Sequence, residues 1–168
     1  MKRVQCLAIF CLFLASVASA QGPTTDSEKH VLKATVMQKN LYPDGVDAKK
    51  EIKEAQVRAV KVNKRVMLVF GGNWCYDCYV LDRALHDGLA GQIFITNFEL
   101  VHVNIGLGDK NPDLASKYKI PLEKGVPAIA ILSSEGKLIY SSKNKEFEKA
   151  RTLTEEDLVA FLSKWKSK

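Results

Sequence analysis

The chain has 168 residues and a formal net charge of +6 at neutral pH. This length fits a single domain that can bury a sizeable core. Hydrophobic residues make up 46% and charged residues 26% of the sequence, values that are ordinary for a soluble globular protein and exclude general disorder. No motif of interleaved aromatic and basic residues accompanies the positive charge, so we expect no nucleic-acid partner.

The first twenty residues have the pattern of a secretory signal peptide. Lys2 and Arg3 give a positive start, an apolar run follows over 4–17, and small residues at 18–20 suit a signal peptidase. We therefore expect cleavage after Ala20 and an exported protein with no stable membrane insertion. An uncleaved membrane anchor is the alternative, although the apolar run is short for a bilayer span.

Residues 21–43 form an N-terminal extension in our division of the chain. They begin as a polar leader, are ambiguous over 31–42, and end at a turn signal, Pro43-Asp44-Gly45. We place a single domain over 44–168. Its first helix is expected to begin after Asp47, which can cap it, because apolar residues then recur at helical spacing.

A short continuous apolar run at 66–70 predicts a strand that is buried on both faces. The segment Gly71-Gly72-Asn73 ends this strand. A helix is then expected to begin near Cys75 and to carry Cys78 and the apolar side chains up to Leu85 on its packed side.

The rest of the domain alternates strands and helices. The predicted elements are a strand at 98–105, a short helix at 111–118, a strand at 126–132, a returning strand at 138–141 after a hairpin turn, and a last helix from residue 154. Thr154 and Asp157 have capping-box spacing at the start of that helix. The complete order is helix, strand, helix, strand, helix, strand, strand, helix, which predicts an α/β sandwich with a mixed sheet.

The placement of the cysteines indicates a reactive pair rather than a disulfide that stabilises the fold. Cys6 and Cys11 lie in the predicted signal peptide, so Cys75 and Cys78 are the cysteines of the mature chain. Exported proteins that use disulfides as staples spread cysteines over distant segments. Two cysteines three positions apart close a tiny loop and constrain little of the chain.

The sequence Trp74-Cys75-Tyr76-Asp77-Cys78 places two thiols at the expected start of a helix. Unpaired N–H groups and the partial positive charge at a helix N-terminus stabilise a thiolate there. We expect the Cys75 sulfur to be exposed in the first turn, with Cys78 one turn further and close enough to form a disulfide. A cysteine pair of this kind is suited to thiol–disulfide exchange.

From Asp47 to the C-terminus the sequence resembles the thioredoxin superfamily. The resemblance rests on the strand before Trp74-Cys75-x-x-Cys78, on Asn104-Ile105 at a strand end, on Lys117-Tyr118 at a helix end, and on Gly125-Val126-Pro127 at the start of the next strand. It implies a thioredoxin fold, a three-layer α/β/α sandwich with a mixed central sheet. It also implies that the Val126–Pro127 peptide bond is cis and faces the cysteine pair.

The resemblance implies exchange with protein or peptide thiols and disulfides. Cys75 would attack a substrate disulfide, and Cys78 would resolve the mixed disulfide. The implied substrate-binding residues are Trp74, Val126 and Pro127, because the proline leaves the Val126 backbone free to bind an extended chain. A membrane or periplasmic redox partner would reset the pair, so we expect a periplasmic rather than an extracellular protein, and a monomer.

Three positions depart from the thioredoxin pattern or affect the direction of exchange. Thioredoxins bury an acidic residue where this chain has Val69, and tend to have a lysine where it has His102. His102 is therefore a candidate for proton transfer, and a packed or solvated side chain is the alternative. The charge of Asp77 near Cys75 should disfavour the thiolate and favour the reductase direction, against the helix dipole.

Other interpretations of the cysteine pair stay open. Cys75 and Cys78 have zinc-ligand spacing, but a closed zinc site needs four ligands, and no second cysteine pair or paired histidines are present. Haem attachment requires a histidine directly after the second cysteine, where the chain has Tyr79. We expect neither a metal nor a cofactor. The remaining alternative is a peptide-binding or chaperone module in which the disulfide is permanent and structural.

Overall fold

The computed structural model describes residues 31–32, 37 and 40–167. The predicted signal peptide and most of the N-terminal extension lie outside the described residues. Within the part of the chain that is described, none of the helices has the length and the apolar character needed to span a bilayer.

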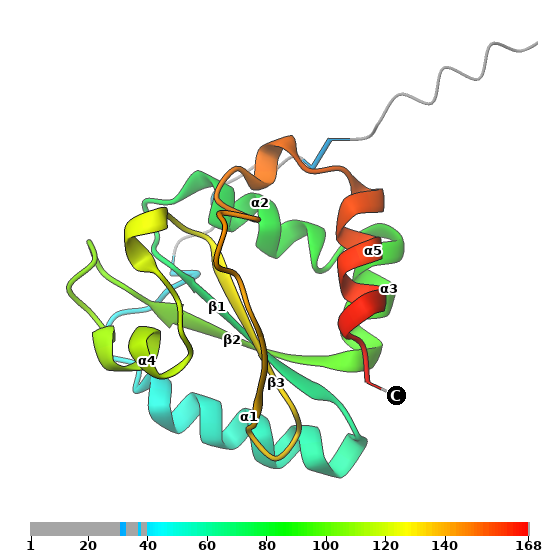
Figure 1. Cartoon of the computed structure of the whole chain (residues 1–168), viewed down its shortest axis with the longest axis horizontal. Helices are drawn as coiled ribbons and strands as arrows, with labels where there is room; N and C mark the ends of the chain where they lie inside the picture. Colours follow the sequence, from blue (N-terminus) through cyan, green and yellow to red (C-terminus); the bar gives the residue numbers. More distant parts are fainter. Residues whose placement is uncertain (1–30, 33–36, 38–39, 168) are drawn as a thin grey trace, which may run out of the picture.

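The described chain forms a four-stranded mixed sheet with helices on both faces (Figure 1). The helices are α1 (Ala48–Val62), α2 (Tyr76–Ala84), α3 (Gly88–Asn97), α4 (Pro112–Lys117) and α5 (Glu155–Trp165), with short 3-10 helices η1 (Leu122–Lys124) and η2 (Ala150–Thr152). The strands are β1 (Arg65–Gly71), β2 (Phe98–Asn104), β3 (Ala128–Leu132) and β4 (Leu138–Ser141). Their order is β2-β1-β3-β4, with β1 parallel to β2 and antiparallel to β3, so the predicted thioredoxin-like sandwich is confirmed.

The strand β1 is buried on both faces, as its continuous apolar run predicts. Val66, Leu68 and Phe70 pack in a core that α1 and α4 cover, whereas Met67 and Val69 pack in a second core under α2, α3 and α5. Figure 1 shows α1 and α4 on one side of the sheet and the other three helices on the opposite side. The sheet therefore forms the middle of three layers.

The helix α3 corrects the predicted order, which has no helix between α2 and β2. Its sequence contains two glycines and several β-branched residues, which have low helix propensity, so the local pattern does not reveal it. Packing provides the stability instead. Phe94 of α3 is buried and stacks on Phe98 with ring centroids 5.7 Å apart, and α3 packs against α5. The sequence pattern likewise does not predict the short helices η1 and η2.

The sheet brings three chain segments to one edge. Because β1 and β2 are parallel, the turn into α2 and the loop after β2 leave the sheet side by side, and the Ile105 N–H donates to the Gly71 carbonyl at 2.9 Å. Because β3 is antiparallel to β1, its first residue, Ala128, pairs with Phe70 at the same edge. The cysteine pair and the segment that leads into β3 therefore meet there.

Candidate active site

Cys75 and Cys78 form a disulfide at the start of α2, with their Cα atoms 5.3 Å apart. Cys75 is the N-cap of α2, and its sulfur accepts a hydrogen bond from the Cys78 N–H at an N···S distance of 3.2 Å. If the disulfide opened, a thiolate at Cys75 would keep this donor and would lie at the positive end of the helix dipole. The site is therefore built to stabilise one nucleophilic sulfur.

The expectation of an exposed Cys75 sulfur is wrong. Cys75 is 5% exposed and Cys78 is 0% exposed. The Val126 carbonyl oxygen lies 3.6 Å from Cys75 Sγ, and the Val126–Pro127 peptide bond is cis, as expected. The segment that leads into β3 therefore covers the sulfur, and Cys75 is the more accessible of the two cysteines by a small margin.

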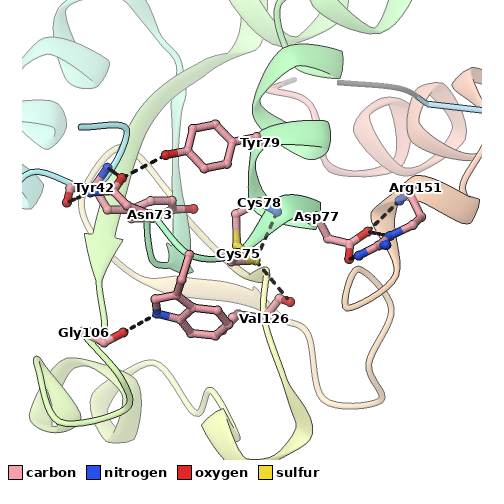
Figure 2. The surroundings of a disulfide bond; sticks show 10 residues. Tyr42, Asn73, Cys75, Asp77, Cys78, Tyr79, Gly106, Val126 and Arg151 are labelled. Atoms are coloured by element: carbon pink, nitrogen blue, oxygen red, sulfur yellow. Dashed lines mark hydrogen bonds and ion pairs between the residues drawn. A yellow bond between two sulfur atoms is a disulfide. The ribbon is translucent and has the colours of Figure 1, made fainter. Parts of the chain in front are cut away.

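Trp74 presents an apolar surface beside the disulfide. It is 54% exposed, and its indole N–H donates to the Gly106 carbonyl at 2.7 Å (Figure 2). A Cβ on Gly72 would lie 2.6 Å from the indole nitrogen and 3.2 Å from the Gly106 carbonyl oxygen, so the close approach requires glycine at position 72. Tyr76 and Leu107 are also exposed apolar side chains near the start of α2 and in the loop after β2.

Asp77 does not act on Cys75 as an uncompensated negative charge. Its carboxylate accepts hydrogen bonds from the Arg151 side chain, with Nε 3.0 Å from Oδ1, and from the Arg151 backbone N–H at 2.9 Å (Figure 2). Burial alone would raise the pKa of Asp77, but the hydrogen bonds and the charge of Arg151 hold it below its ordinary value. The sequence-based charge argument for the reductase direction therefore no longer holds for Asp77.

The side chain of His102, in β2, contacts Asp82 and Tyr42. Its Nε2 lies 2.9 Å from Oδ1 of Asp82, and its ring meets the Tyr42 ring edge-on with centroids 5.1 Å apart. Among the described residues, no hydrogen bond joins His102 to a cysteine. Val69, where thioredoxins have an acidic residue, pairs with His102 in the register of β1 and β2. A carboxylate thus reaches this region from α2 rather than from β1.

Tyr42 joins the end of the N-terminal extension to the site. Its backbone N–H donates to Asn73 Oδ1 at 2.8 Å, and its carbonyl accepts from Nδ2 of Asn73 at 2.9 Å and of Asn104 at 3.0 Å. The Tyr79 hydroxyl donates to the same Asn73 oxygen at 3.2 Å. The Tyr42 side chain is fully buried. Asn73, which follows β1 by two residues, and Asn104, the last residue of β2, therefore hold this segment against the domain.

Sequence reasoning missed three residues of this region. Asp82 follows Cys78 by four positions, which is about one helical turn, so the spacing alone could have identified it. Tyr42 precedes the recognisable motif by more than one element, and Arg151 lies far beyond it. No local pattern in the sequence signals either of them.

The site is suited to redox chemistry of the two sulfurs. In the residues that the structure describes, no group of three or more His, Cys, Asp or Glu side chains is arranged to hold a metal ion. Cys75 and Cys78 are bonded to each other, so neither sulfur is a free thiolate ligand in this state. Opening and closing of their bond is the chemistry that the geometry offers.

Comparisons with known proteins support a thioredoxin-like fold. Residues 47–134 match a protein family described as thioredoxin-like. Among solved structures, a disulphide isomerase from Xylella fastidiosa Temecula1 is 31% identical with a TM-score of 0.69, over 78% of this chain and 98% of that chain. A comparison with curated protein sequences gave no significant match.

A more distant structural likeness concerns the C-terminal domain of DsbD from Neisseria meningitidis. Its reduced form is 16% identical with a TM-score of 0.51, over 69% of this chain and 95% of that chain. Its oxidised form is 14% identical with a TM-score of 0.51, over 71% of this chain and 96% of that chain. At this level of identity, the likeness shows the fold alone.

Proposed function

The chain belongs to the thioredoxin-like family, and from this membership we propose that it is an exported thiol–disulfide oxidoreductase that works through Cys75 and Cys78. The observation that carries the proposal is the Cys75–Cys78 disulfide at the N-terminus of α2, where the Cys78 N–H points at the Cys75 sulfur. The similar protein from Xylella fastidiosa is described as a disulphide isomerase, which supports exchange chemistry at this pair.

The proposed reaction passes through a mixed disulfide. The Cys75 thiolate attacks one sulfur of a substrate disulfide and releases the other substrate sulfur as a thiolate. Cys78 then loses its proton and attacks Cys75 Sγ, which reforms the Cys75–Cys78 disulfide and releases the second substrate thiolate. Two electrons pass from the pair to the substrate, and a membrane or periplasmic dithiol partner must return them.

The proposed substrate-binding residues are Trp74, Val126 and Pro127. Trp74 offers exposed apolar surface, and the Val126 carbonyl lies 3.6 Å from Cys75 Sγ. An extended substrate chain that paired with the Val126 backbone would place its own disulfide beside Cys75, with the indole as an apolar contact.

We propose the reductase direction, and its support comes from the carboxylate of Asp82 rather than from that of Asp77. Asp82 follows Cys78 by four positions in α2, about one helical turn. A carboxylate at that place opposes a stabilised thiolate in the reduced pair, and a pair without that stabilisation is the better reductant. His102, bonded to Asp82, is the proposed group for proton transfer.

The proposed location is the periplasm, with the protein acting as a monomer after cleavage at Ala20. Support comes from Lys2, Arg3 and the apolar run over 4–17. The division into 1–20, 21–43 and 44–168 remains a prediction.

The experiment that tests the proposed exchange traps its intermediate. Cys78→Ser removes the resolving thiol and keeps the nucleophile, so incubation of the reduced variant with oxidised glutathione should accumulate a mixed disulfide at Cys75. Intact-mass spectrometry detects this adduct. Cys75→Ser is the matched control, and we expect it to form far less adduct because Cys78 is fully buried.

Other results would refute the exchange function. Equal adducts on both variants would mean that Cys75 is not the selective nucleophile. If neither variant formed an adduct and Cys75→Ser still bound an unfolded peptide like the wild type, the site would instead be a binding module with a structural disulfide.

A further inference from the structure

The hydroxyl of Tyr42 is buried and has no hydrogen-bond partner among the described residues. The whole residue is 0% exposed. Buried polar groups are nearly always hydrogen-bonded, because burial without a partner costs free energy. An unpaired buried hydroxyl beside a redox pair therefore suggests that its partner forms in another state of the pair.

The sulfur of Cys78 lies close to this hydroxyl. A Cβ built on Gly71 would lie 2.5 Å from the Tyr42 hydroxyl oxygen and 2.6 Å from Cys78 Sγ. The oxygen and the sulfur thus flank one point, and their separation cannot exceed the sum of those two distances. Figure 2 shows the Tyr42 ring directed toward the disulfide. A side chain at position 71 would clash with both atoms, so glycine there permits the hydroxyl and the sulfur to lie this close.

The backbone and the ring of Tyr42 are both held in place. Asn73 and Asn104 bind its backbone groups, and the edge-on contact with His102 packs its ring. A hydroxyl held in this way needs little reorganisation to meet a charge that forms on the neighbouring sulfur.

The electrostatic surroundings keep the Tyr42 proton on its oxygen. Burial, followed by the charges of Asp82 and Tyr79, raises the pKa of Tyr42 well above its ordinary value. Asp82 and Tyr79 belong to α2, and His102 faces the ring from β2. The hydroxyl is therefore a hydrogen-bond donor that does not ionise at neutral pH.

We propose that the Tyr42 hydroxyl donates a hydrogen bond to the Cys78 sulfur when the disulfide opens, and thereby stabilises the Cys78 thiolate during exchange. When a donor thiolate attacks Cys75 Sγ, the bond between the cysteines breaks and Cys78 Sγ takes the electron pair. The Tyr42 hydrogen bond forms on that sulfur and stays in place when the sulfur later takes a proton from solvent. In the reverse step the Cys78 thiolate, hydrogen-bonded to the Tyr42 hydroxyl, attacks Cys75 Sγ of the mixed disulfide.

This role compensates for a missing group. Thioredoxin-like chains that carry a buried acid in the central strand can use it at the second cysteine, whereas this chain has Val69 there. Tyr42 comes from the N-terminal extension, outside the residues 47–134 that match the family. The extension thus supplies a group to the reacting atoms. The inference rests on the proposed exchange function.

The test compares Tyr42→Phe with Tyr140→Phe and the wild type. Tyr140 packs on Phe161 and Trp165 on the other face of the sheet, so its variant makes the same chemical change away from the disulfide. Because the hydroxyl has this partner only when the pair is reduced, its loss should shift the glutathione equilibrium of Tyr42→Phe toward the disulfide by roughly fivefold. Reduction of its disulfide by dithiothreitol should slow by a similar factor, and Tyr140→Phe should match the wild type.

A second measurement separates this role from packing. In a Cys75→Ser background, the ultraviolet absorbance of the thiolate should show a higher pKa for Cys78 when Tyr42 is also replaced by Phe. Thermal unfolding of the disulfide form of Tyr42→Phe should occur at or above the wild-type temperature, because the variant loses an unpaired buried hydroxyl.

The outcomes distinguish the two levels of the proposal. If the wild type exchanges with glutathione and Tyr42→Phe has the same equilibrium and the same Cys78 pKa, the role of Tyr42 is refuted. A lower unfolding temperature with an unchanged equilibrium would likewise mean that Tyr42 only packs. If the wild type does not exchange at all, the proposed function fails first and the inference fails with it.

Discussion

Among single residues, Arg151 compensates the charge of Asp77, which lies two positions after Cys75. Asp77 lies in the first turn of α2, where a carboxylate would ordinarily face the helix N-terminus and the neighbouring sulfur. Instead, the Arg151 guanidinium and backbone N–H take up both of its oxygens. Arg151 also lies over the Tyr76 ring, 4.9 Å from its centroid, which fixes the cation beside the motif.

Removing the Arg151 cation should therefore change the reactivity of the Cys75 sulfur. We expect Arg151→Gln to lower the thiolate fraction of Cys75 at neutral pH severalfold, because Asp77 then presents an uncompensated negative charge. The measurement is the rate of alkylation of the reduced protein by iodoacetamide as a function of pH.

The double variant Asp77→Asn/Arg151→Gln is the matched control, since it removes both charges together. It should recover an alkylation profile close to that of the wild type. If Arg151→Gln itself alkylated like the wild type at every pH, Asp77 would have no influence on Cys75.

The separation along the sequence of the two residues in a contact decides which site residues can be predicted. Cys75, Cys78 and Pro127 belong to short motifs with fixed spacing, and the structure places all three at one edge of the sheet. Arg151 reaches Asp77 across 74 positions, and Tyr42 reaches Asn73 across 31. Contacts over such distances depend on the completed fold, so no local pattern reports them.

Among the elements, those with strong local signals are the ones that the sequence predicts. Thr154 and Asp157 form the expected capping box of α5, with Asp157 N–H donating to Thr154 Oγ1 and Thr154 N–H donating to Asp157 Oδ2. By contrast, α3 has no cap of this type and a sequence of low helix propensity. Its helical state follows from packing against α5 and β2, which a single sequence does not display.

The capping box provides a test at this scale. Thr154→Ala should lower the free energy of unfolding by about 1 kcal/mol, because the Asp157 N–H at the start of α5 loses its acceptor, Thr154 Oγ1. Urea denaturation of the disulfide form measures the change.

Thr152→Ala makes the same chemical change two residues earlier. Thr152 is exposed, and its hydroxyl donates to the Lys149 carbonyl. We expect a loss within about 0.5 kcal/mol for this surface change. Equal losses in the two variants would mean that the capping box contributes nothing particular to α5.

For the whole molecule, the candidate site lies at the edge where the ends of β1 and β2 meet the start of β3. The order of helices and strands predicts a mixed sandwich, and the sheet order confirms it. The predicted boundary after residue 43 assigns Tyr42 to the extension, yet its fully buried side chain packs against the domain. The end of the extension therefore packs in the same core as Cys75 and Cys78, and a boundary drawn from composition alone does not show this.

The central claim is that Cys75 and Cys78 form a reversible redox pair that works as a reductant. The most direct measurement is titration of the pair against glutathione buffers of graded ratio, with Cys75→Ser as the control that cannot form the disulfide. We predict a reversible two-electron transition with a potential nearer to the about −270 mV of thioredoxin than to the about −180 mV of protein disulfide isomerase. A potential above the latter value would contradict the reductase direction, and a pair that does not titrate at all would contradict the redox function itself.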